Sequence, residues 1–176
     1  IGYDLGYQDA ATFRADWDTH LPAATVDRLA PECGRRGWRA RDRIDALRDV
    51  SIPLRAATEV FEATVLPRYV GLTRKAFPGV EDLAPDAAGA LLSLVYNRGA
   101  SMSGDSRREM RAIRDLVPRK DYPGIARELR GMKRIWEDRG LAGLLKRRED
   151  EAELVERATQ RVAGAGAAVT LASTTA

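Results

Sequence analysis

Three short segments of this sequence hold residue types that could do chemistry together. Residues 1–7 place an aspartate and two tyrosines around two glycines, a composition that favours a tight turn presenting polar and aromatic groups. Residues 94–99 end an apolar stretch with the amide of Asn97 and the guanidinium of Arg98. Residues 132–149 combine a tryptophan with several lysines and arginines. Each segment also has a plain structural interpretation: a turn, a helix C-cap, and two packed helices with a basic, solvated face.

Helices must position these segments, because apolar residues recur at spacings of three and four from residue 9 onward. Asp9 is expected to cap a helix that places Phe13 and Trp17 on one face. Residues 85–98 are apolar nearly all round, which predicts a buried central helix ended by a left-handed Gly99. Pro67 is expected to kink or break the helix that follows residue 51.

Three more helices are expected in the second half of the chain. They are predicted at residues 106–116, at residues 121–136 and after Gly140. The fold class is therefore mainly α: an α+β arrangement of helices around a buried central helix, with a small N-terminal β-turn remnant. The length of 176 residues suits one domain, which we place at residues 1–158, followed by a flexible Gly/Ala-rich tail at 159–176.

Composition narrows the possible partners. The 29 basic and 26 acidic side chains give a net charge of +3, and they are interleaved as on solvated helix faces. No nucleic-acid partner is expected, because a DNA-binding surface needs a stripe of one sign. The basic pI still leaves a helical nucleic-acid-binding protein as a third, weaker alternative. A single Cys33 excludes an internal disulfide, and with a single His20 it argues against a metal site. No apolar run approaches the length that spans a membrane.

In order and spacing, the three segments resemble the phage-type lysozymes, also called endolysins, of glycoside hydrolase family 24. That family has a T-I-G-x-G-H/Y turn, a central helix ending in F/Y-N-x-G, and a closing Trp, Gly-Leu and Arg-Arg-x-x-Glu. The matching residues here are Ile1-Gly2-Tyr3, then Tyr96-Asn97-Arg98-Gly99, then Trp136, Gly143-Leu144 and Arg147-Arg148 with Glu151. The continuation Asp4-Leu5-Gly6-Tyr7 departs from the commonest turn and indicates a divergent branch. The resemblance covers residues 1–158.

The resemblance implies a muramidase that hydrolyses the β-1,4 bond between N-acetylmuramic acid and N-acetylglucosamine in peptidoglycan. Such a reaction needs a carboxylic acid to protonate the leaving oxygen, and the family pattern places that glutamate N-terminal to Ile1. The same pattern assigns substrate binding to six residues: Gly2, Tyr3, Asp4, Tyr7, Asn97 and Arg98. We expect Asp4 to bind substrate or stabilise the turn, and not to act as the acid.

Three other carboxylates, Glu59, Glu62 and Glu109, are interpreted as surface ion-pair partners. An alternative function is a non-catalytic peptidoglycan-binding or structural protein with a lysozyme-like fold. The partner is then peptidoglycan in either case, with no cofactor, no metal and no membrane span. The expected place of action is the bacterial cell wall, in the periplasm or after secretion, while the oligomeric state is left open.

Overall fold

A computed structural model describes residues 2–172, with side-chain surroundings up to residue 161. The chain divides into two compact units, Ile1–Arg68 and Tyr69–Ala176, where the sequence predicts a single domain over residues 1–158. Both units are mainly helical, as predicted, and the described residues contain no strand. The expected β-turn remnant is not confirmed, since residues 2–4 are irregular and Leu5–Tyr7 form a 3-10 turn. No helix in the described part is long and apolar enough to cross a membrane.

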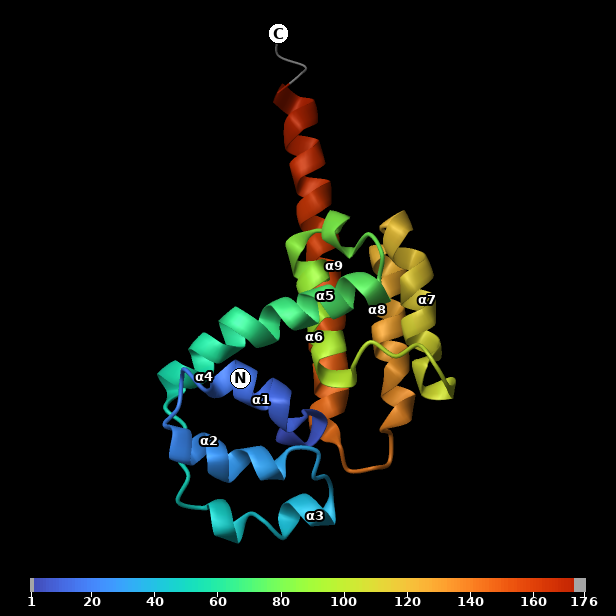
Figure 1. The fold of residues 1–176 in the computed structure, drawn as a ribbon. Coiled ribbons are helices and arrows are strands. Elements are labelled where there is room, and N and C mark those ends of the chain that lie inside the picture. The colour runs from blue at the N-terminus through green and yellow to red at the C-terminus, as the bar shows by residue number, and fades with distance from the viewer. Residues whose placement is uncertain (1, 173–176) are drawn as a thin grey trace. The chain divides into compact units, whose positions relative to one another are not determined.

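The first unit is built from short helices around an aromatic core. Asp9 caps α1 through a hydrogen bond from Thr12 N to Asp9 Oδ1 of 2.8 Å, as predicted. Phe13 and Trp17, four residues apart on α1, are both buried. The helices of this unit are α1 (Ala10–Trp17), α2 (Ala23–Leu29), α3 (Trp38–Arg41) and α4 (Leu54–Val60) (Figure 1).

The expected break at Pro67 takes a different form in the structure. A π-helical turn, Phe61–Val65, follows α4, and α5 (Leu66–Ala76) begins directly after it. Leu66 N donates to Phe61 O, five residues back, so the wider turn satisfies the backbone just before the proline. Pro67 lies in the first turn of α5, where its missing N–H costs least. The helical path is therefore widened before the proline and is not ended by it.

The second unit is a group of helices that includes α6 (Pro85–Arg98). Figure 1 shows α6, α7 (Arg108–Leu116), α8 (Tyr122–Gly131) and α9 (Ala142–Ala172) running side by side. One face of α6 is completely covered, but Gly89 and Asn97 are exposed, and the most extensive helix contact of this unit is that of α8 with α9. The central position expected for α6 therefore stays a prediction. Gly99 ends α6 with φ +75, as expected of a C-terminal glycine. The fully buried core residues include Leu91, Leu94, Val95, Ile113, Ile125, Leu129, Met132 and Val155.

Two boundaries in this unit differ from those predicted. The helix expected over residues 121–136 ends at Gly131 and continues as the 3-10 turn Met132–Ile135. Its predicted cap is confirmed, since Asp121 Oδ1 accepts from Gly124 N at 2.9 Å. The last helix, α9, extends through Ala172 and so enters the segment predicted to be a tail. Residues 173–176 of that predicted tail lie outside the described residues.

Candidate functional site

The C-terminal end of α6 brings Asn97 and Arg98 next to residues from α9 and from the turn after α8. The Arg98 guanidinium carbon lies 4.7 Å from the centroid of the Trp136 ring, in a cation–π contact. Arg98 Nη2 also donates to Ser106 O at 2.6 Å, which fixes the guanidinium against the loop after α6. Arg107, in turn, donates to the backbone oxygen of Arg98. The end of α6 is therefore held in one position by contacts from two segments.

Arg148, on α9, also contacts Asn97, and its side chain is completely buried. Its Nη2 donates to Glu151 Oε1 at 2.8 Å and to Asn97 Oδ1 at 3.3 Å. Glu151 Oε1 also accepts from Ser93 Oγ at 2.7 Å. We call Ser93, Asn97, Arg148 and Glu151 the α6–α9 polar cluster. It links one face of α6 to α9 through polar side chains, and a separate ion pair of Asp86 with Arg161, at 2.9 Å, links the same two helices.

Burial dominates the electrostatics of this cluster. Desolvation raises the pKa of Glu151, and it lowers the pKa of Arg148. Desolvation, with the charges of Arg107 and Arg148, lowers the pKa of Arg98 to about 10. Among the described residues, Arg148 Nε and Nη1, Arg98 Nε and Glu151 Oε2 have no hydrogen-bond partner. These atoms are buried and therefore out of reach of a ligand at the surface, and Glu151, only 2% exposed and bound to Arg148, is poorly placed to protonate a substrate.

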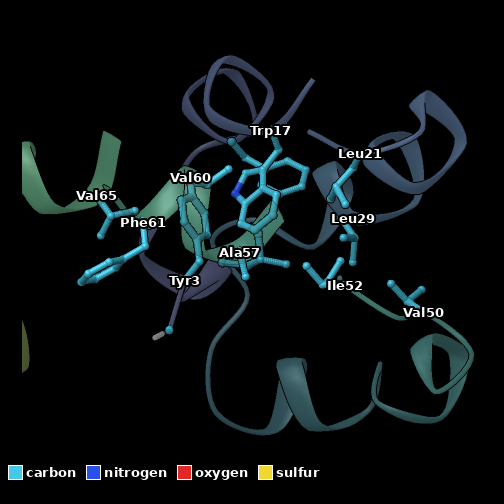
Figure 2. Close-up of a pocket in the computed structure, with 13 residues that line it drawn as sticks. Tyr3, Trp17, Leu21, Leu29, Val50, Ile52, Ala57, Val60, Phe61 and Val65 are labelled. Carbon is cyan, nitrogen blue, oxygen red and sulfur yellow. The ribbon is translucent and has the colours of Figure 1, made fainter. Parts of the chain in front are cut away.

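The predicted residues of the first turn lie in the other unit and have different surroundings. Gly2 and Tyr3 line a cavity of about 280 Å³ whose walls are almost entirely apolar. Figure 2 shows the rings of Tyr3, Trp17 and Phe61 around it, with aliphatic side chains opposite. A polysaccharide needs convergent polar groups, and this lining offers few. The remaining lining residues are Leu5, Phe13, Leu21, Leu29, Val50, Ile52, Ala57, Val60 and Val65.

Asp4 and Tyr7 lie in the same turn but make different contacts. Asp4 Oδ1 accepts from Gly6 N at 2.9 Å, so Asp4 caps the 3-10 turn, which is one of the two roles expected for it. A Cβ at Gly6 would lie 2.8 Å from Arg35 O, which explains why this position has no side chain. Tyr7 is 68% exposed, and the Arg36 guanidinium carbon lies 4.0 Å from its ring centroid.

An ion pair between buried Asp16 and half-buried Arg68, which the sequence pattern did not predict, involves the cavity residue Tyr3. Tyr3 Oη donates to Asp16 Oδ2 at 2.7 Å, and Arg68 Nη2 donates to both carboxylate oxygens of Asp16 at 2.8 and 2.9 Å. Burial, and then the hydrogen bond to Asp16, raise the pKa of Tyr3 well above its ordinary value. A signal for Asp16 existed, because it lies three residues after Phe13 and so shares its buried face. Nothing local indicated Arg68, which is 52 residues away.

The carboxylates interpreted as surface ion-pair partners divide into two cases. Glu59 accepts from Arg55 Nε at 2.7 Å and lies near a surface, as predicted, while Glu62 is exposed. Glu109 is also paired, but it is only 2% exposed, so its surface placement was wrong. Burial opposes ionisation of Glu109, yet hydrogen bonds from Arg134 and Arg108 hold its pKa below the ordinary value. Arg134 lies 25 residues away in sequence, so this contact depends on the tertiary fold.

The structure thus separates the six predicted binding residues into two groups. Gly2, Tyr3, Asp4 and Tyr7 belong to the first unit, whereas Asn97 and Arg98 belong to the second. Among the described residues, no group of three or more His, Cys, Asp or Glu side chains could hold a metal ion. A comparison with models of known protein families finds no match, and neither does a search of curated proteins.

Proposed function

We propose that this protein is a peptidoglycan muramidase, which hydrolyses the β-1,4 bond between N-acetylmuramic acid and N-acetylglucosamine. The observation that carries the proposal is the contact between two of its sequence motifs. Asn97 and Arg98 end the helix of the second motif, and they touch Arg148 and Trp136 of the third motif at 3.3 and 4.7 Å. Residues 51 positions apart in the chain therefore meet at one end of α6.

Asn97 is the residue best placed to contact a sugar chain in the proposed site. Asn97 is exposed, and its Oδ1 accepts from Arg148. The two N–H groups of the amide nitrogen are not used in that hydrogen bond and can donate to a ligand. Such donors can bind the acetamido oxygens or hydroxyls of the polysaccharide. In the proposed reaction the carboxylic acid that protonates the leaving oxygen lies N-terminal to Ile1, as the family resemblance implies.

A second candidate function is peptidoglycan binding without hydrolysis, and one observation favours it. The four buried carboxylates of the described residues, Asp16, Glu32, Glu109 and Glu151, all form ion pairs with arginines. A carboxylate whose oxygens already accept hydrogen bonds from a guanidinium is poorly placed to donate a proton to a substrate, as a general acid must. On this second proposal the α6 end contacts the glycan strand, and no bond is broken.

One experiment distinguishes the two proposals. The protein is produced with the native sequence N-terminal to Ile1, where the proposed acid lies, and is incubated with purified insoluble peptidoglycan. Both the protein pulled down and the soluble fragments released are measured. Fragments with a muramic acid reducing end support the muramidase. Binding without any fragment supports the binding protein and contradicts the muramidase. If the protein neither binds nor releases fragments, both proposals are wrong.

Two substitutions of Asn97 separate substrate contact from a structural role. Asn97→Asp keeps an oxygen for Arg148 but removes the amide donors, whereas Asn97→Ala removes both. If the donors bind the glycan, both variants lose binding. If Asn97 only positions Arg148, Asn97→Asp retains binding and the substrate-contact role is refuted. Arg114→Ala is the matched control, because Arg114 is an exposed residue on α7 outside the cluster.

A further inference from the structure

Residues 35–43 are the most strongly charged part of the first unit. They contain five arginines, at 35, 36, 39, 41 and 43, and a single acid, Asp42. The segment therefore has an excess of four positive charges, while the whole chain has +3. All five arginines are exposed. The interleaving of charges that the sequence shows elsewhere is absent from this segment.

Large apolar side chains are exposed in the same segment. Trp38 is 68% exposed and Ile44 is 56% exposed. Ile44 N donates to Arg41 O, and Leu47 N donates to Ile44 O, both at 3.1 Å and three residues apart. Residues spaced by three lie above one another in such 3-10 geometry. Arg41, Ile44 and Leu47 therefore form a row, and Trp38 lies one turn before it on α3.

The arginines of this segment differ in how far their charge is compensated. Arg35 and Arg43 both pair with Glu32, at 2.9 Å each. Arg39 instead lies over Trp38, with its guanidinium carbon 5.4 Å from the centroid of the indole ring. No carboxylate of the described residues pairs with Arg39 or with Arg41. These two positive charges are therefore available to an anionic partner.

We propose that residues 35–47, the Arg/Trp surface, bind the headgroup region of an anionic lipid bilayer. Guanidinium groups attract lipid phosphates, and a tryptophan is favoured at the boundary between headgroups and acyl chains. Exposed Ile44 favours a lipid partner over other polyanions. Burial of an aliphatic side chain in a bilayer contributes favourable binding free energy, whereas contact with a hydrated phosphate polymer contributes none. This surface shares no residue with the α6 end, and the proposal does not depend on the muramidase.

The test uses the full chain and vesicles of two compositions, pure phosphatidylcholine and an equimolar mixture of phosphatidylcholine and phosphatidylglycerol. We expect cosedimentation with the anionic vesicles only, and a blue shift of tryptophan fluorescence on binding. Arg39→Gln/Arg41→Gln should weaken binding about 25-fold, since each surface arginine contributes about fivefold. Trp38→Ala should weaken binding and abolish the blue shift, because the other two tryptophans are mostly covered.

The matched control is Arg114→Gln/Arg127→Gln, which removes the same charge from exposed positions of the second unit. It should bind like the wild type, and circular dichroism should show that every variant is folded. Equal binding by the control and by Arg39→Gln/Arg41→Gln would overturn the proposal. So would equal binding to both vesicle types. Binding to duplex DNA that competes with the vesicles and is insensitive to Trp38→Ala would identify a general polyanion site and would also overturn it.

Discussion

Replacing Arg148 with methionine should destabilise the protein through the charge that it leaves behind. Arg148 is completely buried and Glu151 is 2% exposed, so neither charge is solvated by water. In the variant, Glu151 keeps its hydrogen bond from Ser93 Oγ but loses the guanidinium that compensates its charge. Removing one member of a buried ion pair costs about 3–5 kcal/mol. We expect Arg148→Met to lower the free energy of unfolding by this amount at neutral pH.

A double substitution isolates the pair from the packing around it. Arg148→Met/Glu151→Leu removes both charges and fills a similar volume, and it should cost about 1 kcal/mol or less. The two substitutions together are then far less harmful than Arg148→Met alone. The measurement is equilibrium urea unfolding of the three proteins, followed by circular dichroism. Lys146→Met is the control, because Lys146 forms an exposed pair with Asp150 on the same helix, and its loss should change stability little.

The pH dependence of Arg148→Met provides a second check on the same reasoning. Without the guanidinium, the buried carboxyl of Glu151 favours its protonated form even more strongly than in the wild type. The variant should therefore lose less stability at about pH 5 than at about pH 7. If the single and double variants are equally unstable, and if their stability does not depend on pH, then the uncompensated charge of Glu151 is not the cause of the instability. That result would refute the argument.

Three further predictions concern other parts of the structure. Ala57→Leu should raise the free energy of unfolding by about 1–2 kcal/mol in thermal or urea unfolding, because its added carbons fill the cavity of the first unit; Ala63→Leu, on an exposed position of the π-helical turn, should not. Tyr3→Phe should cost about 1–2 kcal/mol of unfolding free energy, since it removes the hydroxyl bonded to buried Asp16. Burial raises the pKa of Glu151 above 4.5, so folding favours its protonated form; the wild type should gain stability relative to Glu151→Gln as the pH falls toward 4.5, and an unchanged difference would contradict this.

Local signals in the sequence predicted the helices well, because caps and turns are decided by residues close in the chain. The caps at Asp9 and Asp121 and the helix end at Gly99, which has a positive φ, are all where the sequence placed them. The behaviour around Pro67 was less predictable. A proline removes one donor, and the backbone can either end the helix or widen it by a π turn. Which outcome occurs depends on packing along the whole helix, and that packing is not encoded by the proline itself.

Burial of charged side chains was the main feature that the sequence could not predict. Arg148 lies in a run of basic and acidic residues that is typical of a solvated helix face, yet it is the largest fully buried side chain described. Its partner Asn97 comes from α6, 51 residues earlier in the chain. Glu109 is a similar case, because Arg134 reaches it from the turn after α8. The hydrophobic periodicity and the composition of a helix predict which of its faces is apolar. They do not predict whether a charged side chain on that face forms an ion pair with a residue distant in sequence.

The same limit explains why the two groups of predicted binding residues need separate tests. A resemblance of motifs says that residues are used together, whereas binding requires that their polar atoms are free to reach a ligand. The Asp4 carboxylate already accepts from Gly6 N, and the Tyr3 hydroxyl already donates to Asp16. Asn97 keeps its amide donors because Arg148 occupies only its oxygen. A glycan contact by the predicted residues is therefore best sought at Asn97, where the variant that preserves the structure is also the one that removes the donors.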